Sequence, residues 1–119
     1  MSKIAEPRRG EVNLVNFDPS VGAEIQKMRP ALIIQNDVAN RHSAVTIVAA
    51  LTSRFHTPLR PVQVLVPAGE AGLNTDSVVL LNQIRSIDKQ RLAQRLGNVK
   101  PATLAAVDRA LAISLNLRP

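Results

Sequence analysis

Short hydrophobic runs separated by polar turn residues occupy the first three-quarters of the chain. Some alternate with the period of two that is typical of strands, and others are short β-branched runs that suit buried strands. Together they predict strands at residues 11–17, 31–35, 44–51, 61–66 and 76–87. The last run is either one long strand or two strands broken near Gln83. The polar segment 36–43 predicts a turn region.

The last quarter of the chain has the spacing of helices. Asp88 is a helix-capping residue type and Gly97 a helix-terminating one, so residues 89–96 are predicted to form a short helix. From Pro101 onward, apolar residues recur every three or four positions and predict a C-terminal helix with one buried stripe, made of Leu104, Val107, Leu111 and Leu115. The expected fold class is α+β, mainly β: a single domain over 1–119, built as a small β-barrel with helices appended, with 1–9 as a polar, basic and flexible tail.

Composition narrows the classes of function. The chain has 119 residues, of which 45% are hydrophobic, so it can bury a substantial core. It contains no cysteine, which excludes disulfides, zinc–thiolate sites and cysteine nucleophiles. The longest nearly apolar run, residues 44–51, is far shorter than the roughly 20 residues of a membrane-spanning helix. The N-terminus lacks the apolar stretch of a secretory signal, so we expect a cytoplasmic protein with no membrane partner.

The charge indicates an anionic partner. The 15 basic residues exceed the 9 acidic residues by six, and 11 of the basic residues are arginines, whose planar guanidinium matches phosphate. Phe17 and Phe55 are the only aromatic residues, which are too few to stack many bases in a long, nonspecific single-strand groove. A short recognition site on a nucleic acid fits better.

The sequence motifs leave few reactions open. His42 and His56 are 14 positions apart, and no metal-ligand cluster, phosphate-binding glycine loop or nucleophile elbow is present in the sequence. We therefore expect no metal and no cofactor, and we interpret both histidines as surface loop residues. RNA cleavage fits this inventory, because the ribose 2′-hydroxyl is itself the nucleophile and the protein only positions the chain and stabilises the phosphorane.

Five blocks of sequence stand in order along the chain: R-R-G-E-V (8–12), F-D-P-S-V-G (17–22), R-P-A-L-I-I-Q-N-D (29–37), I-V-A-A-L-T-S (47–53) and N-T-D-S-V-V-L-L-N-Q-I-R-S-I-D-K-Q-R-L (74–92). Together with the C-terminal helix they resemble the MazF/PemK family of toxin endoribonucleases over about residues 8–117. Several blocks at consistent separations are more specific than one motif. Asn13 and Ala23 depart from the family pattern, which commonly has an aromatic residue and a serine there.

The resemblance implies a fold, an activity and partners. The fold would be the SH3-like barrel of the CcdB/PemK/MazF type, with short helices and a C-terminal helix. The activity would be metal-independent cleavage of single-stranded RNA, such as mRNA, at a short sequence, leaving a 2′,3′-cyclic phosphate and a 5′-hydroxyl. The partners would be a second copy of the chain and a cognate antitoxin whose acidic, extended tail occupies the RNA groove.

The resemblance also implies catalytic residues. The arginine before the proline falls on Arg29, and the threonine of the I-V-A-A block falls on Thr52. A guanidinium can span two nonbridging oxygens and stays charged, while a threonine hydroxyl at a strand end can donate to the same phosphate. Glu24, in the loop before Arg29, is a supporting candidate that would orient the arginine or accept the 2′-proton.

The candidate RNA contacts lie before and after Arg29 and Thr52 in the sequence. They are Phe17, Lys27, Arg54, Phe55, Arg60 and Gln83. Gln83 matches a family glutamine. The basic loop 54–60 follows Thr52, so it either guides phosphate or is simply solvated. Phe55 either stacks on a base or plugs the edge of the barrel. Three further arginines are interpreted as solubility and dimer-rim charges, namely Arg85, Arg91 and Arg95.

Two alternatives to RNA cleavage remain open. In the first, the chain is a noncatalytic toxin of the same fold that binds a protein target such as DNA gyrase, as CcdB toxins do through their C-terminal helix. In the second, it is a degenerate family member that binds RNA or antitoxin without cutting. The first activity would not depend on Arg29 or Thr52.

Overall fold

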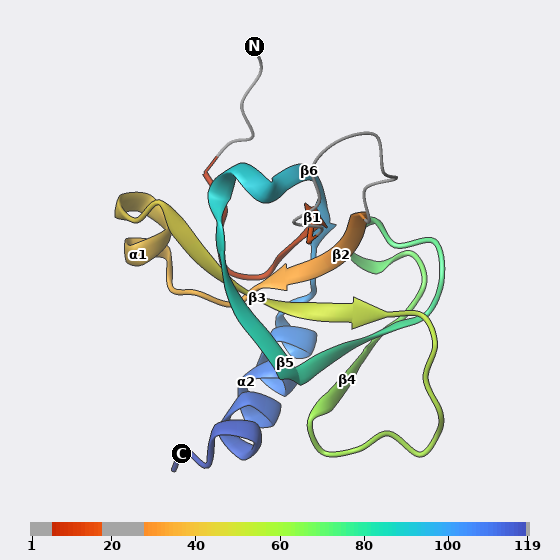
Figure 1. The fold of residues 1–119 in the computed structure, drawn as a ribbon. Helices are drawn as coiled ribbons and strands as arrows, with labels where there is room; N and C mark the ends of the chain where they lie inside the picture. Colours follow the sequence, from red (N-terminus) through yellow and green to blue (C-terminus); the bar gives the residue numbers. More distant parts are fainter. Residues whose placement is uncertain (1–5, 18–27, 119) are drawn as a thin grey trace.

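A computed structural model describes residues 6–17 and 28–118 of the chain. Six strands, two helices and two short 3-10 turns follow one another along the described residues (Figure 1). In chain order they are β1 (Glu11–Asn16), β2 (Met28–Ile33), α1 (Asp37–His42), β3 (Val45–Thr52), β4 (Gln63–Val66), η1 (Glu70–Gly72), β5 (Ser77–Asp88), η2 (Lys89–Arg91), β6 (Leu92–Asn98) and α2 (Pro101–Leu115).

The six strands form one antiparallel sheet in the order β4-β5-β3-β2-β1-β6. The two edge strands, β4 and β6, are not hydrogen-bonded to each other, so the sheet is barrel-like but not closed. Its gap is filled where η1, which follows β4, packs against β6. A Cβ on Gly97 would lie 2.8 Å from the Ala71 carbonyl carbon, and one on Gly72 would lie 2.2 Å from the Leu96 oxygen. Only glycine permits this close approach of the two backbones.

Most of the predicted strands are confirmed, with one shift that concerns the site. The second strand begins at Met28 rather than at residue 31, so Arg29 and Pro30 belong to β2 and pair with Val15 and Leu14 of β1. Arg29 therefore projects from a strand and not from the preceding loop. The region 76–87 forms a single strand, β5.

The strand β5 bends sharply in its middle (Figure 1). Its pairing with β3 runs from Leu51 opposite Val79 to Ala49 opposite Ile84. Over that interval β3 advances by two residues and β5 by five. Strand β5 therefore contains three extra residues relative to β3, which form a bulge in the pairing. Such a bulge bends a strand and increases its twist. The sequence-based break near Gln83 corresponds to this bend.

The predicted helix at 89–96 is wrong. Asp88 does cap a turn, because its side chain accepts a hydrogen bond from Gln90 N at 2.8 Å, but only the 3-10 turn η2 follows. Residues from Leu92 onward form β6, which pairs antiparallel with β1. Pairing with a neighbouring strand overrides local helix propensity here.

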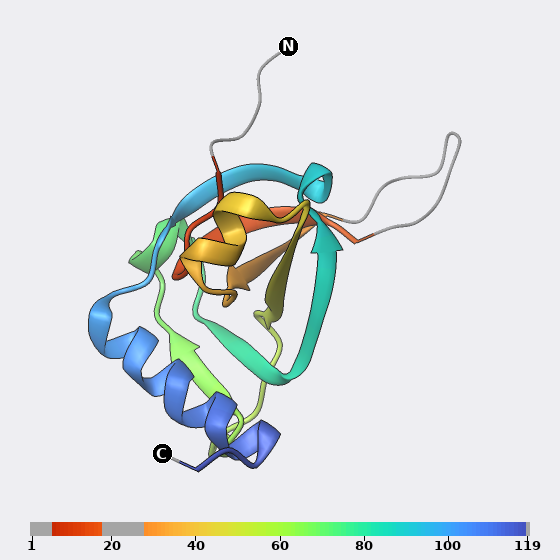
Figure 2. The same ribbon diagram turned by 90° about the vertical axis from the view of Figure 1, so that its left-hand side faces the viewer.

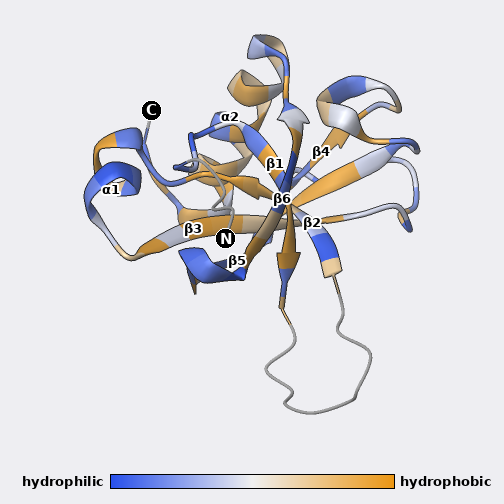
Figure 3. Ribbon diagram, turned by 90° about the horizontal axis from the view of Figure 1, so that it is seen from above, coloured by the Kyte–Doolittle hydropathy of each residue, from blue (hydrophilic) through white to orange (hydrophobic). Residues whose placement is uncertain are grey.

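The predicted turn region at 36–43 contains a helix instead. Asn36 caps α1, with its side chain accepting from Ala39 N at 2.8 Å. The helix is short, ends at His42, and is largely hydrophilic, whereas hydrophobic residues concentrate on the strands (Figure 3). A six-residue helix is too short to show a clear helical period in the sequence.

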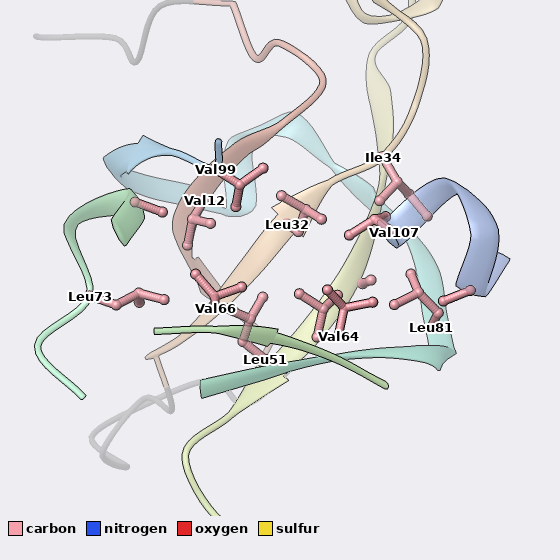
Figure 4. Close-up of a cluster of buried hydrophobic side chains, with 14 residues drawn as sticks. Val12, Leu32, Ile34, Leu51, Val64, Val66, Leu73, Leu81, Val99 and Val107 are labelled. Carbon is pink, nitrogen blue, oxygen red and sulfur yellow. The ribbon is translucent and has the colours of Figure 1, made fainter. Parts of the chain in front are cut away.

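Two groups of buried side chains stabilise the sheet. The larger cluster, shown in Figure 4, lies between the sheet and α2 and includes Leu32, Leu51, Val66, Leu81 and Val107. The smaller cluster lies on the other face of the central strands and consists of Val15, Ala31, Ile33, Val48, Ile87 and Leu92, with Phe17 packed against it. Both faces of the sheet centre are therefore fixed by packing.

The C-terminal helix packs against β4 and β5 (Figure 2). Val107 is fully buried and Leu104 and Leu111 are partly buried, as the predicted stripe requires. Leu115, the last member of that stripe, is 49% exposed, because the helix there extends beyond the core. No helix in the described part of the chain is long and apolar enough to cross a membrane.

Part of the predicted N-terminal tail lies within the described residues. Pro7 is buried, and Arg9 donates from Nε to the Ile34 carbonyl at 2.8 Å and pairs with Asp108 of α2 at 2.7 Å. The Arg9 backbone N–H donates to Asp37 at 2.7 Å. That hydrogen bond, aided by the Asn40 amide and nearby arginines, lowers the pKa of Asp37 despite the opposing effect of desolvation.

Candidate active site

The register of β2 and β3 places Arg29 next to Thr52. Ala31 pairs with Ala50 and Ile33 with Val48, in an antiparallel ladder. Arg29 lies two residues before Ala31 in β2, and Thr52 lies two residues after Ala50 in β3. Because the strands are antiparallel, both steps lead in the same direction from the Ala31–Ala50 pair. Because side chains two residues apart in a strand share a face, the guanidinium and the hydroxyl project from the same side of the sheet.

Thr52 is held at the last position of β3. Its hydroxyl oxygen accepts a hydrogen bond from Arg54 N at 3.1 Å, which fixes the side chain at the point where the strand gives way to the loop. Threonine is also stiff at χ1 because its Cβ is branched. The hydroxyl also donates to the Arg54 carbonyl, at 3.4 Å. Because this hydrogen bond is long and the residue is only partly buried, the proton can turn to a ligand on the open side.

Arg29 is exposed and forms no ion pair with any residue in the ranges 6–17 and 28–118. The sequence also allows the interpretation of Arg29 as a solvated loop charge paired with Glu24, a position that lies outside the described residues. Its neighbour in β1, Val15, is fully buried and anchors the backbone beneath the side chain. The guanidinium is thus carried by a rigid strand and points toward solvent, as binding of an anion requires.

Two hollows meet at this pair. The first has a volume of about 600 Å³ and is lined on its far side by small hydroxyl residues, Ser53, Thr75 and Ser77. The second has a volume of about 570 Å³ and is lined by amide, basic and aromatic side chains. Four residues line both hollows: Arg29, Leu51, Thr52 and Arg54. The arginine–threonine pair therefore lies where the two hollows adjoin, and the two hollows together are called the groove.

The second hollow brings together three of the predicted RNA contacts, because Phe17 and Gln83 line it together with Arg54. Phe17 and Gln83 are far apart in sequence. The Arg85 guanidinium lies over the Phe17 ring, 5.2 Å from its centroid, which is a cation–π contact. A flat ring and a flat cation stacked at the edge of the groove form a surface on which a base can rest.

Other predicted site residues lie elsewhere. Neither Phe55, which is partly buried, nor Arg60, which is exposed, lines either hollow. Two more, Glu24 and Lys27, lie outside the described residues, as does Ala23. The histidines are both exposed, His42 at the end of α1 and His56 in the loop after β3. Among the described residues, no group of three or more His, Asp or Glu side chains is placed to hold a metal ion.

Sequence reasoning missed two residues of the groove. It assigned Arg85 to solubility and the dimer rim, but Arg85 lines the second hollow. It did not single out Gln63, which lines the same hollow at the start of β4. For Gln63 the sequence did contain a signal. It is the polar residue in the alternating segment P-V-Q-V-L-V (61–66), and a polar residue in such a segment lies on the face of the strand away from the core.

Asn13, the first departure from the family pattern, is fully buried in β1 between Ala31 of β2 and Arg95 of β6. Neither its side-chain nitrogen nor its side-chain oxygen has a hydrogen-bond partner among the described residues. Burying an unpaired amide destabilises a fold by about 1–3 kcal/mol. Asn13 thus occupies an interior position where an aromatic or aliphatic side chain would suit the packing better.

An arginine and a hydroxyl line the groove of a small barrel-like sheet with a C-terminal helix, an arrangement whose chemistry suits contact with a phosphate. The family of PemK-like, MazF-like toxins of type II toxin–antitoxin systems matches residues 8–115. Endoribonuclease EndoA of Bacillus subtilis (strain 168) is 44% identical over 110 residues, which cover 92% of this chain and 95% of that protein.

Solved structures of MazF-type toxins match the fold of this chain. The MazE-MazF structure (Form-II) from Deinococcus radiodurans matches with a TM-score of 0.80 and 29% identity, covering 97% of this chain and 100% of that one. An endoribonuclease in complex with its cognate antitoxin, from mycobacterial species, matches with a TM-score of 0.79 and 29% identity, covering 95% and 98%. The chain belongs to the PemK-like, MazF-like toxin family.

Proposed function

We propose that Arg29 and Thr52 form the reaction centre of this MazF-type toxin endoribonuclease, and that single-stranded RNA runs through the two hollows on either side of them. One observation carries the proposal: the β2–β3 register places both side chains on one face, where both line both hollows. The Bacillus subtilis relative, which is named an endoribonuclease, supports the reaction class.

The reaction needs only the substrate's own nucleophile. The ribose 2′-oxygen attacks phosphorus, the P–O5′ bond breaks, and the products are a 2′,3′-cyclic phosphate and a 5′-hydroxyl. The 2′-proton leaves during attack and the 5′-oxygen gains a proton. Arg29 stabilises the charge that develops on the phosphorane, and the Thr52 hydroxyl donates to one of its oxygens. Glu24 remains the candidate for orienting Arg29 or accepting the 2′-proton.

The flanking nucleotides contact the rest of the groove. Phe17 and Gln83 bind the nucleotide in the second hollow, and Arg54 neutralises phosphate where the hollows meet. Phe55 and Arg60 act from the loop between β3 and β4, and Lys27, two positions before Arg29 in the sequence, is a further candidate for a phosphate contact. The substrate is mRNA, which places the activity in the cytoplasm.

The partners follow the family. The chain forms a homodimer, and a cognate antitoxin with an acidic, extended tail binds the same groove. The net charge of +6 favours such a tail, and the groove's arginines supply the contacts. The antitoxin inhibits because its carboxylates compete with phosphate for Arg29 and Arg54. The Deinococcus radiodurans and mycobacterial complexes are the precedents for this assembly.

The activity is tested with one pair of substrates. In EDTA, the protein should cleave an RNA at a short sequence, and should not cleave the same RNA with a single 2′-deoxy nucleotide at the cut. The deoxy substitution removes the nucleophile and leaves the rest of the strand intact. Cleavage of both strands, or a requirement for magnesium, would contradict the mechanism.

The alternative of a noncatalytic toxin predicts a different outcome for Arg29→Ala. For the endoribonuclease, the variant should lose at least about 100-fold in cleavage rate, because one charge-stabilising group is removed, and should no longer arrest growth when expressed. A toxin that acts by binding a protein target through α2 would stay toxic. Cleavage in vitro and growth arrest, measured on the same variant, separate the two activities.

A further inference from the structure

The side-chain amide of Gln63 has a fixed orientation. The Arg60 backbone N–H donates to Gln63 Oε1 at 2.9 Å, and the Gln63 backbone N–H donates to the Arg60 carbonyl at 2.9 Å. Because an N–H can only donate, the amide oxygen must face Arg60 and the amide nitrogen must face away from it. Gln63 Nε2 has no hydrogen-bond partner among the described residues. It is therefore an oriented donor at a wall of the second hollow.

The rest of that hollow also favours donors. The Arg54 and Arg85 guanidiniums can donate but not accept, Gln83 can do either, and Leu80 is apolar. A base that presents an amino group to Gln63 would place donor against donor. A base with a carbonyl oxygen at the same edge would pair with Nε2.

We propose that Gln63 is a specificity-determining residue that selects a keto base, uracil or guanine, at one position of the cleavage sequence. The proposal rests on the proposed endoribonuclease function. Uracil O4 and guanine O6 are acceptors, whereas cytosine N4 and adenine N6, at the equivalent edges, are donors. Single-stranded bases are read at these edges when they are splayed out of the stack. A site built to donate rejects a base that cannot accept, because its own polar group is then left unpaired.

The variant Gln63→Glu tests the proposal most directly. It keeps the length of the side chain and the oxygen that accepts from Arg60, and it replaces the oriented donor by an acceptor. Cleavage of a randomised RNA pool, followed by sequencing of the new 5′ ends, gives the base preference at every position. At one position the preference for uracil or guanine should fall about tenfold and shift toward adenine or cytosine, as expected for one reversed hydrogen bond.

A matched control separates this effect from charge. Gln90→Glu makes the same change on an exposed residue of η2 that lines neither hollow, and it should keep the wild-type preference at every position. If Gln63→Glu melts well below the wild type, Gln63→Met removes the donor without adding charge, and should flatten the preference at the same position.

The outcomes distinguish a failure of the proposed role of Gln63 from a failure of the proposed endoribonuclease function. A folded, active Gln63→Glu or Gln63→Met variant with the wild-type preference overturns the role of Gln63 and leaves the endoribonuclease function standing. A wild-type protein that cleaves no RNA in the pool refutes the proposed function, and the role of Gln63 with it. A wild-type preference for adenine or cytosine at every position also overturns the role of Gln63.

Discussion

The two ends of β3 each carry a threonine on the same face of the sheet, and their surroundings are opposite. Thr46 is fully buried, and its hydroxyl donates to Asn40 Oδ1 of α1 at 2.7 Å. Asn40 in turn donates to the Gln35 carbonyl at 2.9 Å and accepts from Gln35 Nε2 at 3.0 Å. Thr52 lies six residues further along, at the open end of the strand, where its oxygen accepts from Arg54 N at 3.1 Å and its hydroxyl donates a long hydrogen bond, 3.4 Å, to the Arg54 carbonyl.

Whether a threonine hydroxyl stabilises the fold or stays available to a ligand therefore depends on its position along the strand more than on the residue type. At Thr46 the donor is used up inside the protein, so the hydroxyl contributes to stability and cannot reach a ligand. At Thr52 the acceptor side is held by the protein, while the proton makes only a long hydrogen bond to the Arg54 carbonyl, which a ligand in the groove can replace. Satisfied polar networks rigidify a fold, whereas a held but incompletely used group is suited to a site.

The largest expected effect is on catalysis at the open end. Thr52→Val keeps the branched shape and removes the hydroxyl, so the cleavage rate should fall about 100-fold, as when one donor to a transition-state oxygen is lost. The free energy of unfolding should change by no more than about 0.5 kcal/mol, because the position is near the surface. Single-turnover cleavage and urea denaturation measure the two quantities. A full-rate Thr52→Val protein would remove Thr52 from the reaction centre.

The same substitution at the buried end should have the reverse effect. Thr46→Val leaves Asn40 with one donor fewer in a buried network, so it should lower the free energy of unfolding by about 2 kcal/mol. Cleavage per folded molecule should stay at the wild-type rate. If Thr46→Val lowered the rate as strongly as Thr52→Val does, the division of the strand into a structural end and a reactive end would be wrong.

The two buried asparagines should shift stability in opposite directions, with the smallest effect at Asn13. Asn13→Val removes two unpaired buried polar atoms and should raise the free energy of unfolding by about 1 kcal/mol, while Asn40→Val breaks a satisfied network and should lower it. Urea denaturation of both variants provides the measurement. A loss of stability in Asn13→Val would mean that its amide is paired in solution.

Much of the fold could be predicted from the sequence, because the strands between residues 11 and 87 carry clear hydrophobic patterns. The C-terminal helix was predicted from its own apolar spacing of three and four residues. The helix predicted at 89–96 failed, because the strand pairing between β6 and β1 joins residues about 80 apart in sequence and leaves little local signal. The short helix α1 was missed because its stability depends on the Asn36 cap and the Asn40 network rather than on an apolar stripe.

The candidate site was predictable only in part. Arg29 and Thr52 came from the family resemblance, and nothing in the sequence alone shows that the β2–β3 register makes them neighbours. Gln63 and Arg85 depend on the bend of β5 and on the return of β4 beside it, which bring both side chains to the second hollow. Only the three-dimensional path of the sheet places them there.

The three surplus residues of β5 separate two functions along one strand. Before the bend, Val78 and Val79 pair with Thr52 and Leu51 and hold the backbone of the proposed reaction centre, while Gln83, within the bend, has no ladder partner in β3. Substitutions in the bend can therefore reshape the floor of the groove without moving the centre. A toxin with this architecture can change which messages it cuts while the cutting chemistry stays the same.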